Sequence, residues 1–531
     1  MRFSMNMTAA TSSRLKRLLC CLLALAVLPL TAAATTAGRE ESMIFGMLSA
    51  TTQKCNPLHA VEREFMSLTA LVYEGLLTIG DDEQPKAGLA ERWEPSGSGE
   101  SWTFTLREGV TFHDGTPLTA QDVVATIDEI KRLATDETTA YKGAYASVRY
   151  FVASATATDA RTVQIKTNRN NYGFPFAMTF PILPAAQVQA DTPAGTGPYM
   201  IASFVPADYL QLTANPVWWN GVPALKEIMT IFHTGSRELI NSYEYNRVDG
   251  VITRSLAAAQ YRSGLNSQHL SYRTRQLETL QMNNRSYELA DVEVRRAIRA
   301  AINIDSLANS TYMNMVLRTA TPMVPGTWTY YEQPGVLRYD PEGAKAMLEA
   351  AGWIDSDDSG VRDKVIEGKK KELSLRFIVY EEQGNSVRIG AANQIASMLA
   401  GIGIECRIES LTFSQAAARL KAGSYDLAMA AFNMDAAPDP GFLLMKRNTG
   451  NYTGYASDQM DKLFETLRAT MDQDAYTQKL AEIQTLFLQD CPFICLYYRN
   501  GAVLTRRMFT TARSIREPEV LRGIEKGTRL E

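Results

Sequence analysis

The stretch that decides the fold contains three apolar segments, LSLRFIVY at 373–380, IGIECRIES at 402–410 and YDLAMAAF at 425–432. Each segment is short and mostly apolar, which is typical of a buried strand. Helices are expected between them, near 386–400 and near 413–422. Strands that alternate with helices in this way form a parallel sheet covered by helices. The stretch therefore predicts a parallel α/β lobe.

Two segments earlier in the chain have the periodicity of amphipathic helices. They are DVEVRRAIRAAINIDSLA at 291–308 and DPEGAKAMLEAAG at 340–352. The second opens with Asp340-Pro341 and stops at Gly352, which are typical start and stop residues of a helix. Each segment is predicted to form one helix.

The segment TFHDGTPLTAQDVV at 111–124 looks at first like a catalytic cluster, but its spacing indicates structure. In the strand before it, Trp102, Phe104 and Leu106 share one face. Asp114-Gly115 then turns the chain. Thr119 stands three residues before Asp122, which is the spacing of a capping box, so a helix is predicted to begin at Thr119.

No catalytic or metal-binding constellation is recognisable in the chain. His113 and Asp114 are neighbours at a strand end, where consecutive side chains point to opposite faces, which excludes an oriented Asp-His relay. The other histidines stand singly, and there is no nucleophile elbow or phosphate-binding loop. AGTGPYM at 194–200 is predicted to be a tight turn entering a strand. The sequence therefore favours a protein that is not an enzyme and has no cofactor.

Residues 355–367, DSDDSGVRDKVIE, leave two interpretations open. Acidic residues at the first and third positions and Gly360 at the sixth resemble a calcium loop. However, Glu367 falls one position late for an EF-hand. The alternative is a solvated turn before the strand at 373–380.

The N-terminus has the pattern of a secretory signal peptide. Arg14, Lys16 and Arg17 precede an apolar run of 13 residues, LLCCLLALAVLPL, and cleavage is predicted after Ala34. A transmembrane helix needs about 20 apolar residues. Cys20 follows Leu19 near the start of the run, unlike a lipidation site, so an exported, unlipidated protein of the periplasm or extracytoplasmic envelope is expected.

Composition and cysteine content narrow the functional class further. The chain has 531 residues, and a single core stops growing at roughly 250 to 300 residues, so several domains are expected. Removing the basic signal segment changes the formal net charge from -4 to -8, which does not suit nucleic acid. Four cysteines remain, and Cys491 and Cys495 are predicted to pack as small buried residues of one strand rather than to pair.

Taken together, seven strings in order resemble one family, the extracytoplasmic solute-binding proteins of peptide and nickel ABC transporters (solute-binding protein family 5). The strings begin at residues 72 (VYEGLLTIGDDEQPKAGLAERWE), 102 (WTFTLREGVTFHDGTPLTAQDVV), 195 (GTGPYMI), 215 (NPVWWNGVPALKEI), 291 (DVEVRRAIRAAINIDSL), 339 (YDPEGAKAMLEAAGW) and 425 (YDLAMAAF). They spread over most of the mature chain.

The resemblance implies an α/β fold of two hinged lobes, of the type II (cluster C) periplasmic-binding-protein class, with an α+β domain inserted in lobe one. The implied division is 1–34 as signal peptide, 35–57 with 193–277 and 499–531 as lobe one, 58–192 as the inserted domain and 278–498 as lobe two. Ligand is enclosed between the lobes by hinge closure.

The resemblance also implies a ligand site just after the YDL strand. In the family's peptide binders an aromatic residue and, three positions later, an Asp follow this strand, and the Asp pairs with the peptide's α-ammonium while backbone groups pair with the peptide. The equivalent residues are Phe432 and Asp435, with Ala431 and Asn433 beside them. Phe432 replaces the more usual Trp, and Asp439 adds a second acid. An N-cap role before a following helix is the alternative for Asp435.

The function implied is capture of di- to oligopeptides and their delivery to the permease subunits of an ABC transporter, by a monomer. The same fold also carries nickel chelates, oligosaccharides or a signalling peptide, which stay open as alternative ligands. A secreted hydrolase is the alternative from another class, and the lack of a recognisable nucleophile, metal site or acid pair stands against it.

Overall fold

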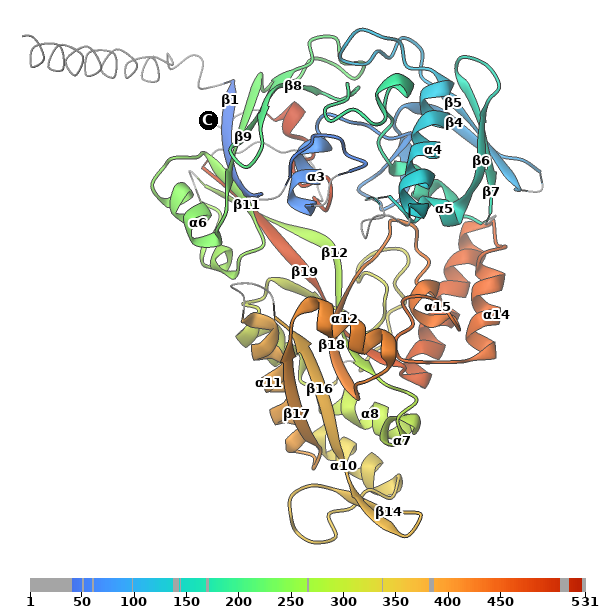
Figure 1. The fold of residues 1–531 in the computed structure, drawn as a ribbon, viewed down its shortest axis with the longest axis vertical. Helices are drawn as coiled ribbons and strands as arrows, with labels where there is room; N and C mark the ends of the chain where they lie inside the picture. Colours follow the sequence, from blue (N-terminus) through green and yellow to red (C-terminus); the bar gives the residue numbers. More distant parts are fainter. Residues whose placement is uncertain are drawn as a thin grey trace, which may run out of the picture.

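Two long antiparallel strands run through the molecule and connect its two lobes (Figure 1). These are β12 (Gln268–Met282) and β19 (Phe493–Thr505). The computed structural model describes residues 41–527 except 50–51, 60–61, 98, 137–142, 144, 169–170, 265–266, 337, 382–385 and 507–514. The predicted signal peptide and its cysteines lie outside the described residues.

The two long strands lie in the middle of an 11-stranded sheet that both lobes share, and the short strand β13 (Val316–Arg318) pairs with β19 outside the main strand order. Beyond β19, in the first lobe, the order continues with β11 (Gly250–Thr253), β1 (Ser42–Leu48), β10 (Glu227–His233), β9 (Tyr209–Ala214) and β8 (Tyr199–Val205). Beyond β12, in the second lobe, it continues with β18 (Leu427–Asn433), β16 (Ser374–Tyr380) and β17 (Glu405–Leu411). The described residues contain no helix long and apolar enough to cross a membrane.

The parallel α/β lobe predicted from the sequence is confirmed. Strand β16 pairs in parallel with both β17 and β18, and helices α11 (Val387–Ala400) and α12 (Phe413–Ala422) connect the three strands. Helix α12 begins at a capping box formed by Thr412 and Gln415 and ends at Gly423, whose φ is +66°. Apolar residues of these elements enclose the core of the second lobe.

Residues 291–308 do not form the single helix predicted for them. Helix α8 (Val292–Ala301) ends before Asn303, whose side chain accepts a hydrogen bond from the Ser306 N–H and starts the short helix α9 (Ile304–Ser306). A side chain that caps within the periodic pattern thus divides the helix. The other prediction is confirmed as α10 (Pro341–Ala350), which Asp340 caps.

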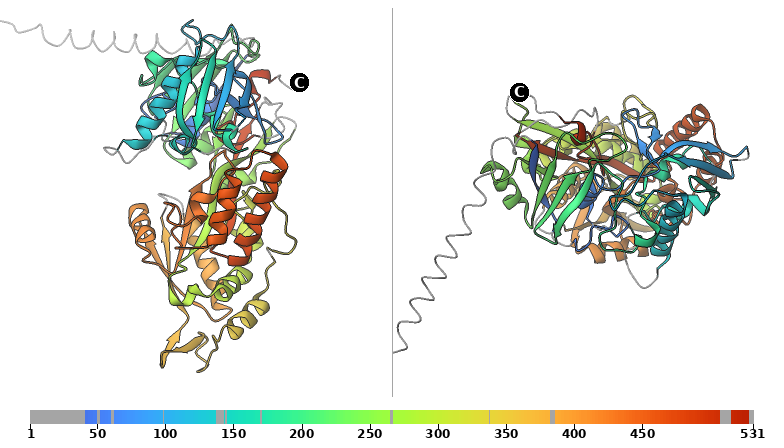
Figure 2. Two further views of the ribbon diagram at one scale, coloured as in Figure 1. Left: turned by 90° about the vertical axis from the view of Figure 1, so that its right-hand side faces the viewer. Right: turned by 90° about the horizontal axis from the view of Figure 1, so that it is seen from above.

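A separate four-stranded antiparallel sheet lies beside the first lobe (Figures 1 and 2). Its strands, in spatial order, are β4 (Ala90–Pro95), β5 (Ser101–Leu106), β7 (Thr162–Thr167) and β6 (Val152–Ala157). The predicted burial of alternate residues on β5 is confirmed. Helix α4 (Ala120–Thr135) covers the sheet and begins with the predicted capping box of Thr119 and Asp122.

His113 has a structural role, as predicted, because its ring binds the tight turn of residues 194–200. The ring nitrogen Nδ1 accepts a hydrogen bond from the Gly195 N–H at 3.3 Å, and Nε2 lies 3.0 Å from the Gly197 carbonyl oxygen. Both glycines pack tightly on the backbone of Val72, where a Cβ atom would approach the Val72 carbonyl oxygen to 2.0 and 2.7 Å. The predicted turn therefore joins the first lobe to the sheet beside it, and β8 follows directly.

Two motifs that are distant in the sequence meet at Glu74. Its carboxylate accepts hydrogen bonds from the indole N–H groups of Trp218 and Trp219 and from the Thr196 hydroxyl, at 3.2, 3.0 and 2.9 Å. Burial raises the pKa of Glu74 to about 7, although these three donors favour the charged form. The contact holds VYEGLL and NPVWWN together in the fold.

The acidic loop at 355–367 forms a solvated turn rather than leading straight into a strand. Asp355 accepts hydrogen bonds from the N–H groups of Ser359 and Gly360, and the hairpin of β14 (Asp363–Ile366) and β15 (Lys369–Glu372) follows before β16. Carboxylate oxygens of Asp355, Asp357 and Asp363 lie within 4.8 Å of one another. Because Lys370 is within ion-pair distance of the last two, it already neutralises part of this charge.

Cys491 and Cys495 are buried and unpaired, as predicted. The prediction that both belong to one strand is wrong for Cys491. It follows helix α15 (Gln473–Asp490) and adopts a left-handed conformation with φ +44°, while Cys495 lies inside β19. Helix α15 extends to Asp490, so that Cys491 lies between the helix and β19.

Candidate functional site

A cavity of about 310 Å³ opens where the second lobe meets the first lobe and the four-stranded sheet region. Its walls come from the end of β18, from β12, from residues 145–151 and 176–179, and from the chain segment 516–519. A smaller cavity of about 110 Å³ adjoins it and shares the walls around Arg275 and Asp435. Segments distant in the sequence therefore enclose one site between the lobes.

The four residues predicted as ligand contacts occupy different environments. Asn433 and Asp435 line the cavity. Phe432 instead lies in the core of the second lobe, packed against Phe442 and stacked on Tyr452 with ring centroids 6.1 Å apart. Ala431 is half-buried on β18 opposite Glu278. Alternation along the strand separates Phe432 from its neighbours, because consecutive side chains point to opposite faces.

Asp435 is exposed to the cavity and lies deep between its walls. Burial raises the pKa of its carboxyl, while a hydrogen bond from Ser147 and the charge of Arg275 act in the opposite direction. The alternative role as a helix N-cap is wrong, because the next helix, α13 (Gly441–Leu444), begins after Pro440. Asp435 thus presents a carboxylate to the cavity.

The second acid of the loop, Asp439, is neutralised within the protein. The Arg468 guanidinium donates to both of its carboxylate oxygens, at 2.6 and 3.0 Å, and the Gly441 N–H donates at 2.9 Å. The Asp439 side chain is only 4% exposed. A bidentate, buried ion pair of this kind leaves little charge for a ligand.

Sequence reasoning did not identify Arg275, although it lines both cavities. It lies on β12, next to the loop of Asp435, since the Met434 N–H donates to the Arg275 carbonyl oxygen at 2.9 Å. The signal in the sequence was RTRQLETL, where two arginines stand two positions apart on the crossing strand. Only the pairing of β12 with β18 shows that Arg275 lies beside the loop of Asp435.

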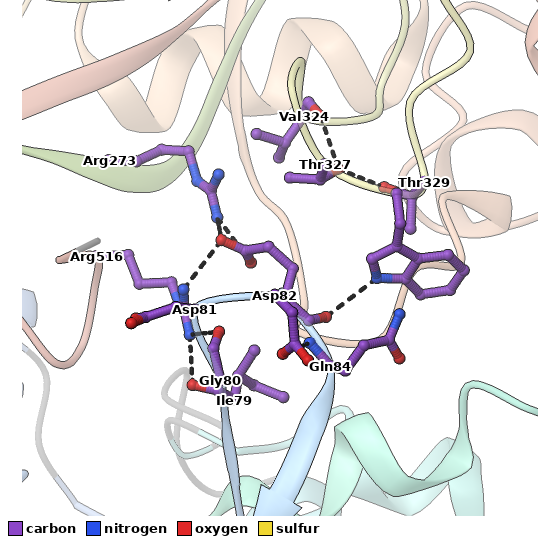
Figure 3. Close-up of polar contacts among 12 residues, drawn as sticks. Ile79, Gly80, Asp81, Asp82, Gln84, Arg273, Val324, Thr327, Thr329 and Arg516 are labelled. Atoms are coloured by element: carbon purple, nitrogen blue, oxygen red, sulfur yellow. Dashed lines mark hydrogen bonds and ion pairs between the residues drawn. The ribbon is translucent and has the colours of Figure 1, made fainter. Parts of the chain in front are cut away.

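A second group of polar contacts lies beside the smaller cavity, and Figure 3 shows these contacts. Glu83, at the tip of the β2 (Leu77–Ile79) and β3 (Pro85–Ala87) hairpin, forms ion pairs with Arg273 at 3.1 Å and Arg516 at 3.0 Å. Arg516 also donates to the carbonyl oxygens of Ile79 and Gly80. These contacts connect the hairpin to the crossing strand and to the C-terminal segment.

Trp328 of the second lobe reaches the same hairpin. Its indole N–H donates to the Glu83 carbonyl oxygen at 3.0 Å, and its ring meets Tyr172 edge-on with centroids 5.7 Å apart. The Tyr172 N–H in turn donates to the Thr470 carbonyl oxygen at 2.9 Å. We call Glu83, Tyr172 and Trp328 the interlobe contact. Together with the described walls, which contain no histidine or cysteine, it suits enclosure of a polar ligand.

Comparison with known proteins gives consistent matches over nearly the whole chain. The family Bacterial extracellular solute-binding proteins, family 5 Middle, matches residues 84–454. The probable D,D-dipeptide-binding periplasmic protein DdpA of Escherichia coli is 24% identical, over 87% of this chain and 89% of the relative. The nickel-binding periplasmic protein of E. coli is also 24% identical, over 85% and 88%.

Solved structures share the fold. The oligopeptide-binding protein AppA from Bacillus subtilis, in complex with a nonapeptide, aligns with a TM-score of 0.69 and 21% identity, covering 92% of this chain and 99% of AppA. The agreement extends over both lobes, which confirms the predicted two-lobed, type II binding-protein fold.

Proposed function

This chain belongs to the bacterial extracellular solute-binding proteins of family 5, and from that premise we propose that it captures peptides between its lobes and delivers them to an ABC permease. Asp435 carries the proposal, because an acid that faces an interlobe cavity provides a partner for a peptide's α-ammonium. Enclosing a cation away from water requires such a partner charge.

The four predicted contacts take different parts in this proposal. Asp435 and Asn433 contact the peptide directly, whereas Phe432 and Ala431 hold the end of β18 in place. The exposed backbone after β18 is available to pair with an extended peptide, which gives affinity that does not depend on side chains. Asp439 takes no part, because Arg468 already neutralises it.

The proposal includes the way in which the protein works. The protein functions as an exported monomer and does not turn its ligand over. Lobe one consists of residues 35–57, 193–277 and 499–531, the inserted domain of residues 58–192, and lobe two of residues 278–498. The position of the four-stranded sheet within 58–192 and of β16 to β18 within 278–498 supports this division. Ligand binding draws the lobes together about β12 and β19.

The test is thermal denaturation of the protein from residue 35 with di- to hexapeptides, and with nickel and sugars as controls. A ligand at 100 times its Kd adds about 2.7 kcal/mol to the stability, which gives a measurable rise in Tm. We expect a rise with peptides that N-acetylation removes.

Two variants of the same loop sharpen this test. Asp435→Asn should lose the distinction between free and acetylated peptides, whereas Asp439→Asn should keep the distinction and lower the basal Tm. Shifts with nickel or sugars alone would contradict peptide capture. Cleavage of the peptides during incubation would contradict binding without turnover.

A further inference from the structure

A third cavity, of about 460 Å³, lies between the first lobe and the four-stranded sheet region. Its walls include the end of α3 (Arg63–Thr69), the segment 73–78, residues 218–220 and the segment 518–526. None of its described wall residues belongs to the second lobe, so closing of the lobes is not needed to form it. It adjoins the interlobe cavity through shared wall residues, which are Met66, Tyr145, Thr179, Pro518 and Glu519. We call it the Glu74 cavity.

Glu74 presents a carboxylate to this cavity. Hydrogen bonds from two indole N–H groups and one hydroxyl occupy three of its acceptor positions. A carboxylate has about four such positions, so one further donor can bind. In the described part of the chain no cation forms an ion pair with Glu74. The charge of Arg107 acts on it from farther away, and the Arg107 Nε donates to the Gly88 carbonyl oxygen at 2.7 Å. A ligand cation would complete the environment of this carboxylate, because an enclosed charge without a partner is unfavourable.

The indole rings of Trp218 and Trp219 supply a second contact for a cation. Their ring centroids are 5.9 Å apart, and both residues line the cavity. The guanidinium of Arg107 lies over the Trp219 ring, 4.4 Å from its centroid, as expected for a cation attracted by an aromatic face. Among the described residues, no cation lies over the Trp218 ring. The face of Trp218 is therefore available to a ligand cation.

Glu519 carries an acceptor that no described donor uses. Its Oε1 accepts a hydrogen bond from the Thr78 hydroxyl at 3.0 Å, whereas its Oε2 is buried and has no hydrogen-bond partner in the described part of the chain. The charge of Arg516 acts on this carboxylate, but Arg516 forms its ion pair with Glu83. Buried polar atoms are normally hydrogen-bonded. A ligand donor is therefore favourable where the two cavities meet, since Glu519 lines both.

The charges around the cavity add up to a negative wall. Asp81 and Arg522 form an ion pair at 3.3 Å and cancel each other. The other charged residues of the described walls are the acids Glu74, Glu519 and Glu525 and the exposed base Lys526. Such a wall attracts a cation and repels an anion.

We propose that the Glu74 cavity is a second ligand site, which binds an organic cation with its ammonium or guanidinium group at Glu74 and over the Trp218 ring. Its volume of about 460 Å³ lies within the range of small-molecule sites, which is about 300 to 1,000 Å³. The cation is a free amine or the basic side chain of a ligand held in the interlobe cavity, because the two cavities share walls. The inference goes beyond the proposed function, since a free amine binds without any peptide.

Calorimetry with n-butylammonium, n-butylguanidinium and neutral butanol tests the site. It is done at a pH above the pKa of Glu74, which burial raises to about 7, so that the carboxyl is charged. Both cations should bind, and butanol should not. Glu74→Gln should weaken the cations by about 10- to 100-fold, since a charged hydrogen-bonded contact is lost. Trp218→Leu should weaken them by about five-fold, and Trp218→Phe, which keeps an aromatic face, by less.

Two further variants show where the cation binds. Asp435→Asn impairs the proposed peptide site and should leave the Kd of both cations within about two-fold of the wild-type value. Glu342→Gln removes the same charge as Glu74→Gln from the exposed surface of α10 and should also bind the cations normally. The Tm of each ligand-free variant shows whether it is folded. If Glu74→Gln does not fold, the comparison of Trp218→Leu with Trp218→Phe decides.

Tripeptides with a central lysine or a central norleucine identify the source of the cation. If the lysine peptide binds more tightly and Glu74→Gln removes the difference, the cation is a side chain of the enclosed peptide. If the two peptides bind alike and butylammonium binds to the peptide-loaded protein, the cation is a free amine. The inference is wrong if neither cation binding nor a lysine preference depends on Glu74, or if Asp435→Asn abolishes cation binding instead. Absence of peptide binding would contradict only the proposed function.

Discussion

Two aspartates four positions apart in the same loop, Asp435 and Asp439, have different electrostatic environments. Asp439 meets the guanidinium of Arg468 and a backbone N–H, so its charge is neutralised within the second lobe. Asp435 meets the Ser147 hydroxyl and the nearby charge of Arg275, and burial still raises the pKa of its carboxyl. The two residues are chemically identical, so the groups around each carboxylate decide which of them is neutralised within the protein.

The raised pKa of Asp435 predicts a pH-dependent affinity. In the ligand-free protein, burial disfavours the charged form of this carboxyl, which raises its pKa. When the pH is lowered through this pKa, the carboxyl becomes protonated. Protonation also removes the charge that an ammonium needs. Peptide affinity should therefore fall as the pH is lowered through this raised pKa, by up to about ten-fold per pH unit below it.

Calorimetry across this pH range would measure the effect. Above the pKa of Asp435 in its folded environment the carboxyl is charged and affinity should be constant. Asp435→Asn should bind weakly with a nearly flat profile. An equal slope in the variant would show that another group titrates.

At the scale of elements, the segment from β5 to α4 shows how the residues that start a helix also bind a segment distant in the sequence. The Asp122 carboxylate accepts hydrogen bonds from the Thr119 N–H and hydroxyl, each at 2.8 Å, and from the Ala185 N–H at 2.8 Å. It therefore holds both the first turn of α4 and a segment 63 residues away. His113 binds the turn at Gly195 in the same region, and burial lowers the pKa of its ring.

Replacing Asp122 by Ala should destabilise the protein by about 2 kcal/mol, because buried N–H donors lose their acceptor. Urea denaturation followed by circular dichroism would measure the loss. Asp128→Ala is a matched control on the exposed side of the same helix, and its effect should stay within about 0.5 kcal/mol. Equal losses in the two variants would contradict the capping role.

At the scale of the whole molecule, the interlobe contact stabilises the closed arrangement of the two lobes and opposes opening of the hinge. Trp328 joins the second lobe to the hairpin that carries Glu83, and its ring packs against Tyr172 and Phe176. The covalent connection between the lobes includes the paired strands β12 and β19. Contacts away from the hinge therefore set how far the lobes stand apart.

Trp328→Ala should open the ligand-free protein and weaken peptide binding by about 5- to 30-fold, because aromatic contacts and one hydrogen bond are lost on closure. Small-angle X-ray scattering would show a larger radius of gyration without ligand and recovery of the compact form with it. Trp328→Phe keeps the ring and should have a smaller effect. An unchanged radius of gyration in the alanine variant would exclude this role.

Prediction from sequence succeeded best where a feature depends on neighbouring residues. The strand and helix order from 373 to 432, the cap at Thr119 and the end of α10 all follow local spacing and match the structure. The helix predicted at 291–308 failed because Asn303 bonds to the backbone three residues later, an option that periodicity does not reveal. For the site, the pattern identified the loop of Asp435, but it did not distinguish its cavity-facing residues from Phe432.

The sequence by itself determined the family, the order of the elements and the loop that follows β18, because periodicity, capping and motif order are properties of adjacent residues. Only the tertiary structure decided that Asp439 is neutralised, that Arg275 lines the same cavity as Asp435 and that Trp328 reaches Glu83. These pairs are 29, 160 and 245 residues apart in sequence. Charge compensation depends on distance in space, and that distance is set by the pairing of β12 with β18 and by the approach of the two lobes.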